Sequence, residues 1–156
     1  MSLSLGMMAA SNFARGFMQG MKKSDAYRQK ASMYQQSSGN YRQSAANTRM
    51  AGALAEDSMR AKNRTALADM SATASENGMG ESPTMMSAIK TNASRLEQNV
   101  LNQRYQTEKE AENYLYQARL AEANARRLKK KARNAFQSGL ISGINSALGG
   151  LNLPIE

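Results

Sequence analysis

The stretch Asn77-Gly78-Met79-Gly80-Glu81-Ser82-Pro83 is the strongest local break in the chain, because it places two glycines and a proline within six residues. Long runs of helix-forming residues, free of proline, lie on either side of it. Two helical arms joined by one short reversal, an αα-hairpin, is the simplest fold that fits. Ser82 as N-cap and Pro83 at the first helical position would start the second arm. We therefore expect Gly78, Gly80 and Pro83 to form the hinge.

The composition of the 156 residues predicts an all-α protein with narrow contacts between helices. Aromatic residues make up 6%, Trp is absent, mean hydropathy is −0.62, and Ala together with 12 Met carries the apolar fraction. Two prolines and few β-branched residues argue against a sheet. Because small side chains fill a seam rather than a broad core, we expect an elongated hairpin with coiled-coil-like packing in a homo-oligomer.

The residue types also bound the chemistry. The chain has no Cys and no His, which excludes disulfides, thiolate chemistry, the common zinc sites and every catalytic triad that needs an imidazole base. The 12 Asp and Glu are scattered along the arms, as on solvated helix faces. We therefore expect no enzymatic activity, no catalytic residues, no metal site and no cofactor.

Five segments follow from the pattern. They are an apolar Met/Gly-rich N-terminal segment (1–21), a first helical arm (22–76), the corner (77–83), a second helical arm (84–137) and a Gly-rich tail (138–156) that is uncharged up to Ile155. Segment 1–21 carries one charge, Arg15, and makes a poor signal peptide because no basic region precedes it. It is interpreted either as a flexible or partner-packed terminus or as a membrane-active helix.

The first arm begins with a plausible cap at Ser24-Asp25. One stripe at helical spacing follows, formed by Tyr27, Ala31, Tyr34, Ser38, Tyr41 and Ala45. The seven-residue tyrosine repeat fits either a stacking ladder for nucleic acid or the edge of a coiled-coil seam, and the seam is the interpretation we favour. A weaker apolar face continues through Met50, Ala53, Leu54, Met59, Leu67 and Met70.

The second arm shows the clearest periodicity. Thirteen positions keep a three/four alternation over six heptads, which predicts a long amphipathic helix with a coiled-coil-like seam. Because many of these positions are alanine, the partner helix must approach closely. The positions are Ala93, Leu96, Val100, Gln103, Thr107, Ala111, Tyr114, Ala118, Ala121, Ala125, Leu128, Ala132 and Ala135.

Near the end of the second arm lies a basic cluster in a chain whose net charge is +9. Three interpretations stay open: a solvated helix end that complements the helix dipole, contact with anionic lipid head groups, and contact with a phosphate backbone. The cluster consists of Arg126, Arg127, Lys129, Lys130, Lys131 and Arg133.

The segment from Asn134 to Ile155 carries no charge. Gly139, Gly143 and Ala147 stand four apart, which is typical of close packing between membrane helices, although the segment is too polar for a stable transmembrane helix. It is interpreted either as a membrane-active segment or as a tail packed against a neighbouring subunit. The candidate packing residues are Phe136, Gly139, Leu140, Gly143, Ile144, Ala147 and Leu148.

In this order of features the chain resembles the internal virion (ejection) proteins of short-tailed phages (podoviruses), in particular the small T7-type internal core protein. The resemblance rests on the apolar N-terminus, the Tyr27-Arg28-Gln29-Lys30-Ala31 type of helix and the Gly78-Met79-Gly80-Glu81-Ser82 corner. It extends to a second helix of the type Arg104-Tyr105-Gln106-Thr107-Glu108 and to the Gly-rich C-terminus.

The resemblance implies a non-enzymatic protein packaged in the capsid interior near the portal. Such proteins leave the particle before the DNA and help to form a conduit across the host envelope. The implied partners are other copies, other ejection proteins, portal or tail proteins, the host envelope membrane and, non-specifically, packaged DNA. Two alternatives stay open beside this one: a structural virion protein fixed at the portal or tail, and a basic helical hairpin that binds nucleic acid through the cluster at 126–133.

Overall fold

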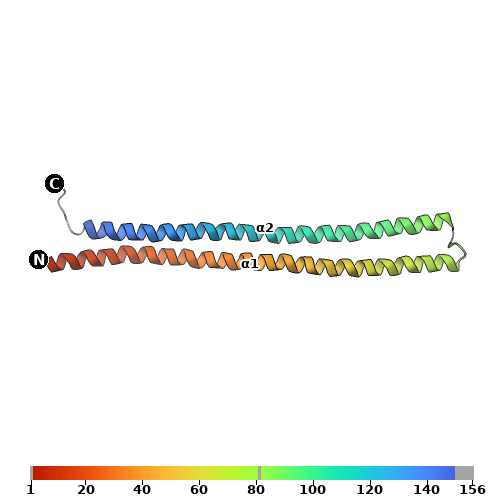
Figure 1. The fold of residues 1–156 in the computed structure, drawn as a ribbon, viewed down its shortest axis with the longest axis horizontal. Coiled ribbons are helices and arrows are strands. Elements are labelled where there is room, and N and C mark those ends of the chain that lie inside the picture. The colour runs from red at the N-terminus through yellow and green to blue at the C-terminus, as the bar shows by residue number, and fades with distance from the viewer. Residues whose placement is uncertain (1, 81, 150–156) are drawn as a thin grey trace. The chain divides into compact units, whose positions relative to one another are not determined.

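The structure, a computed structural model, is an all-α hairpin of two long helices. It describes the backbone of residues 2–80 and 82–149 and the side chains from residue 10 onward within these ranges. Helix α1 spans Ser2–Glu76 and helix α2 spans Pro83–Gly149 (Figure 1). The predicted fold class is confirmed. Glu81 of the corner and residues 150–156 of the tail lie outside the described residues.

The corner closes with backbone hydrogen bonds on both sides of a glycine. The amide of Gly78 donates to the carbonyl of Ser75 at 3.0 Å, and the amide of Met79 donates to Ala74 at 2.9 Å. Gly78 has φ +71°, a left-handed conformation that favours glycine after the last turn of a helix. The amide of Met86 donates to the carbonyl of Ser82 at 3.0 Å. Pro83 is thus the first helical residue, as predicted.

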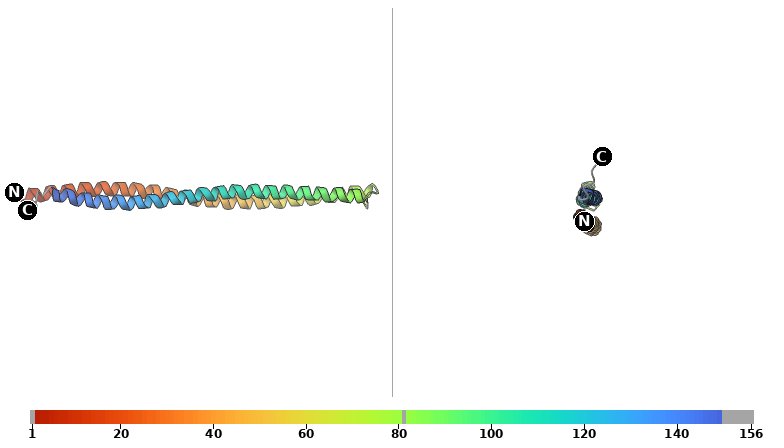
Figure 2. Two further views of the ribbon diagram at one scale, coloured as in Figure 1. Left: turned by 90° about the horizontal axis from the view of Figure 1, so that it is seen from above. Right: turned by 90° about the vertical axis from the view of Figure 1, so that its left-hand side faces the viewer.

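Packing divides the hairpin into two compact units. Unit 1 comprises residues 1–40 and 118–156, and unit 2 comprises residues 41–117. Within each unit, α1 and α2 lie side by side in both directions of view (Figure 1, Figure 2). The expected boundaries at 21/22 and 137/138 are not helix ends, since α1 and α2 continue through them.

The α2 side of the contact is the predicted stripe. All thirteen of its positions are buried or half-buried. Among the described side chains, eight of the nine buried apolar residues are alanine, and the ninth is Val100. A buried methyl group contributes only about 0.8 kcal/mol, so the seam gains its stability from many shallow contacts.

The α1 side follows the predicted stripe in part. Tyr27, Ala31, Ser38, Tyr41 and Ala45 are buried or half-buried. Tyr34 was expected among them but is 41% exposed, although Tyr27 and Tyr41, seven residues to either side of it, are half-buried.

Further along α1, the expected apolar face is wrong for half of its members. Met59, Leu67 and Met70 are half-buried, but Met50, Ala53 and Leu54 are exposed. Gly52 faces α2 instead, and a Cβ built on it would clash with the Thr107 side chain. The prediction was based on large apolar residues, whereas the residue of α1 that approaches Thr107 is Gly52, which has no apolar side chain.

Ser24 is not a helix cap. Residues 2–21 are helical, so Ser24 lies within α1, where it is fully buried and its hydroxyl oxygen has no hydrogen-bond partner. A buried polar group without a partner costs free energy. The correction follows from tertiary packing, since α1 already contacts α2 at Phe13, Gly16 and Gly20, before Ser24.

Ser24→Ala is therefore expected to raise the free energy of unfolding by about 1 kcal/mol, because it removes an unsatisfied hydroxyl and improves helix propensity. Thermal unfolding followed by circular dichroism measures the change. Ser32→Ala is the control, since Ser32 is exposed and donates to the Gln29 carbonyl at 2.7 Å. A loss of stability in Ser24→Ala would mean that the hydroxyl has a partner in solution.

Candidate functional site

The glycines of the predicted packing face contact the other helix of the same chain, within unit 1. A Cβ built on Gly20 would lie 2.5 Å from the Gly139 Cα, and one built on Gly16 would lie 3.0 Å from the Gly143 Cα. Gly20, Gly139 and Gly143 are buried. The small-residue face of α2 is thus occupied by α1, with the two backbones in contact.

A small aromatic cluster lies beside this glycine contact. The rings of Phe13 and Phe17 are stacked at 5.9 Å, and Phe17 meets Phe136 edge-on at 5.9 Å. The ring of Phe13 also approaches Gly143, since a Cβ built there would lie 3.0 Å from the Phe13 Cδ2. Phe136 therefore packs inside the chain.

The other predicted packing residues are less covered. Leu140 and Ala147 are half-buried, whereas Ile144 and Leu148 are 48% and 52% exposed. Ile141, which was not among the predicted residues, is 60% exposed. The described end of unit 1, residues 10–21 with 134–149, is called the tip below. Apolar side chains on its surface are available to a partner.

All six residues of the basic cluster are exposed, and none forms an ion pair with a residue in the described ranges. The cluster is not at a helix end, because α2 continues to Gly149. A helix dipole acts within the last turn, so it does not account for these charges. The six side chains therefore form a solvent-exposed surface, and contact with lipid head groups and contact with a phosphate backbone stay open beside a purely solvated role.

The net charge of the chain resides in unit 1. Unit 1 contains twelve Lys and Arg against three Asp and Glu, a net charge of +9, whereas unit 2 contains nine of each and is neutral. Unit 2 also pairs charges across the hairpin, where Arg49 meets Glu108 at 3.0 Å and Arg60 meets Glu97 at 3.1 Å, and Arg60 meets Glu56 of the same helix at 3.0 Å. The two units therefore present different electrostatic surfaces.

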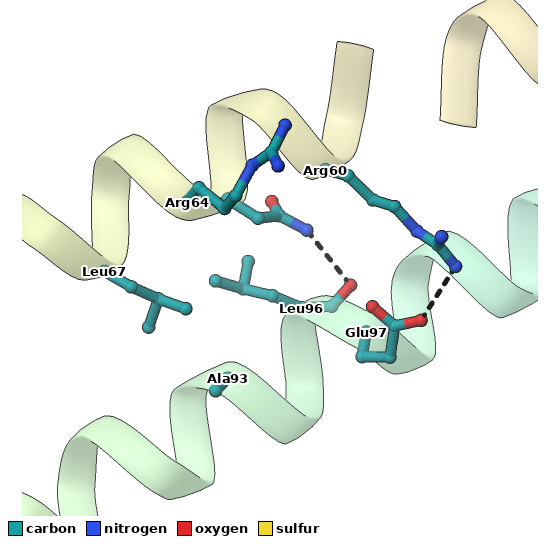
Figure 3. A pocket seen from close by; sticks show the side chains of 7 residues that line it. Arg60, Arg64, Leu67, Ala93, Leu96 and Glu97 are labelled. Atoms are coloured by element: carbon teal, nitrogen blue, oxygen red, sulfur yellow. Dashed lines mark hydrogen bonds and ion pairs between the residues drawn. The ribbon is translucent and has the colours of Figure 1, made fainter. Parts of the chain in front are cut away.

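A groove in unit 2 has a volume of about 410 Å³ and is lined by charged, polar and aliphatic side chains. Figure 3 shows Arg60 reaching Glu97, with Leu67, Ala93 and Leu96 alongside. The amide of Asn63 donates to the Leu96 carbonyl at 3.3 Å. These polar contacts join α1 to α2 and fix their register.

The three hinge residues lie at the corner as expected. Gly78 adopts its positive φ with no atom near its Cβ position, and Pro83 opens α2. Gly80 is tightly placed, because a Cβ there would lie 2.9 Å from the Ser75 hydroxyl oxygen.

The fold and its surfaces define a class: an antiparallel two-helix hairpin with a seam of small residues and a net positive charge that lies in one of its two units. The sequence matches no family model, and no curated protein or solved structure matches it either. Within the part of the chain that the structure describes, no three His, Cys, Asp or Glu residues are grouped to hold a metal ion. No helix of the same part combines the length and apolar character needed to cross a bilayer.

Sequence reasoning did not identify all the side chains that form the tip. It noted neither Phe13 and Phe17 as an aromatic pair nor Met18 and Ile141 as exposed apolar residues. A signal was present, because Gly16 and Gly20 are spaced by four, as are Gly139 and Gly143. In an antiparallel hairpin these two pairs of glycines can lie opposite each other, but the register of α1 against α2 must be known to show that they do.

Proposed function

We propose that this chain is an internal virion protein of the ejection class, packaged near the portal and released into the host envelope to help form a conduit for the genome. The order of sequence features that resembles the small T7-type core protein supports this role. The proposal includes homo-oligomerisation and contacts with other ejection proteins, portal or tail proteins and the envelope membrane.

The observation that carries the proposal is the alanine seam. Each unit is two helices in cross-section, and its buried apolar side chains are almost all alanine. Such a seam stores little burial free energy and contains no disulfide, so the chain can unfold for passage through a narrow channel at low cost. Its exposed apolar residues then need a partner on the far side.

A protein inventory of purified particles before and after triggered DNA release tests the proposal. Quantitative mass spectrometry is expected to find the chain before release and to find it depleted afterwards. Retention in the emptied particle would make it a fixed structural protein, and absence from the intact particle would remove the virion role.

A second candidate, contact with packaged DNA, is supported by the six exposed basic side chains at 126–133. Each phosphate contact is expected to steepen the fall of affinity with salt by a slope of roughly 0.9 on logarithmic axes. Titration of duplex DNA at several salt concentrations measures this slope, and a flat response would exclude the candidate.

A further inference from the structure

The tip joins two segments of low charge that lie at opposite ends of the sequence. The Gly16–Gly143 and Gly20–Gly139 contacts hold them together. Among residues 10–21 and 134–149, Arg15 is the single charged residue. One surface is thus built from both ends of the chain.

The small-residue face of α2 cannot supply a contact outside the chain, because α1 covers it. The large apolar side chains exposed on the tip are Met18, Met21, Ile141, Ile144 and Leu148. Residues 141, 144 and 148 follow helical three/four spacing and therefore share one flank of α2. Ser138 and Ser142, four apart, lie on another flank.

The same flank of α2 carries basic residues one to two heptads earlier. Leu140 follows Arg126 and Arg133 at intervals of seven, and Ile144 follows Lys130 at twice that interval. Positions seven apart remain on nearly the same helix face. A groove in unit 1 is lined by Gln35 of α1 and by Glu122, Ala125, Arg126 and Lys129 of α2. Gln35 therefore lies on the same side of unit 1 as Arg126. Met21 lies two heptads before Gln35 and so shares nearly the same face of α1.

We propose that this side of unit 1 binds the surface of an anionic lipid bilayer. Ile144, Leu148 and their apolar neighbours enter the boundary between head groups and acyl chains. Arg126, Lys129, Lys130 and Arg133 contact the lipid phosphates. This inference deepens, and rests on, the membrane contact in the proposed function, and it specifies a helix pair that lies in the interface rather than spanning the bilayer.

Two observations favour a bilayer over nucleic acid. The cations lie on one flank with exposed apolar side chains, and a phosphate backbone offers nothing for isoleucine or leucine to bind. The net charge of +9 in unit 1, against zero in unit 2, also directs this end of the hairpin toward an anionic partner.

Flotation of the full chain with vesicles tests the inference. The chain is expected to float with vesicles of mixed phosphatidylcholine and phosphatidylglycerol but not with phosphatidylcholine alone. Ile144→Ser with Leu148→Ser is expected to weaken binding at least about tenfold, since two apolar side chains lose their burial. Leu101→Ser with Tyr105→Ser in unit 2 is the matched control, because these residues are similarly exposed at 50% and 62%.

A second pair of variants tests which side binds. Arg126→Glu with Lys129→Glu is expected to abolish flotation with anionic vesicles. Single charge reversals give the matched comparison: Lys130→Glu lies two heptads before Ile144, whereas Lys131→Glu lies one heptad before Ser138 on the other flank and is expected to weaken flotation much less. Equal losses from Lys130→Glu and Lys131→Glu would overturn the proposed side.

The inference is also overturned if the Ile144/Leu148 variant floats like the unchanged protein, or if duplex DNA binding depends on the same cations while vesicle binding is absent. These results are separable from the particle inventory. A chain that leaves the particle but fails the vesicle test loses only this inference. A chain that binds anionic vesicles through Ile144 and Leu148 but stays in the particle loses the ejection role instead.

Discussion

Gly20→Ala is expected to lower the free energy of unfolding of unit 1 by about 1–3 kcal/mol, although alanine is the better helix former. The new Cβ would lie 2.5 Å from the Gly139 Cα and 3.0 Å from the Ala135 carbonyl oxygen. These are backbone atoms, so no side-chain rotation relieves the clash and the helices must separate. Separation also removes contacts of the neighbouring Phe17–Phe136 pair.

Gly39→Ala is the matched control, because Gly39 lies in the same helix with no atom within 4 Å of its Cβ position. It is expected to raise stability by about 0.5–1 kcal/mol through helix propensity alone. Urea unfolding measures both changes, and amide hydrogen exchange locates the loss in residues 10–40 and 118–149. If Gly20→Ala were stabilising as well, the two backbones would not be in contact in solution.

The hairpin could be predicted from local signals because they all agree. The Gly78–Pro83 break marks the turn, and spacings of three and four residues mark the α2 seam from Ala93 to Ala135. The α1 seam was harder, because its contacts use Ser24, Gly52 and other small residues that carry no hydropathy signal. Because the prediction followed large apolar and aromatic residues, it included Tyr34 and Leu54, whose side chains are exposed in the structure.

The candidate site was predictable only as a set of residue types. The exposed basic cluster follows from its sequence, and so does the possibility of close glycine packing. The partner of those glycines does not, since spacing alone fits a membrane helix, a neighbouring subunit or α1 equally well. The confinement of the whole net charge to unit 1 also depends on which segments pair, which the sequence order leaves open.

Val100→Asp is expected to destabilise unit 2 by more than about 3 kcal/mol, since it places a carboxylate at a fully buried position of the seam. Val100 is 0% exposed and is the only buried apolar residue larger than alanine among the described side chains. A hairpin that relies on shallow alanine contacts has little stability to lose, so α1 and α2 should separate around residues 41–117.

Leu101→Asp makes nearly the same chemical change one residue later, where the side chain is 50% exposed. It is expected to alter stability by no more than about 0.5 kcal/mol. Hydrogen exchange of both full-length variants should therefore show loss of protection across unit 2 for Val100→Asp and little change for Leu101→Asp. Equal effects would mean that the two flanks of α2 are equally covered, as in an assembly where neighbouring copies bury Leu101. Because Leu101 and Tyr105 are the controls for vesicle binding, this comparison also establishes whether that flank of unit 2 is free in the protein that meets the bilayer.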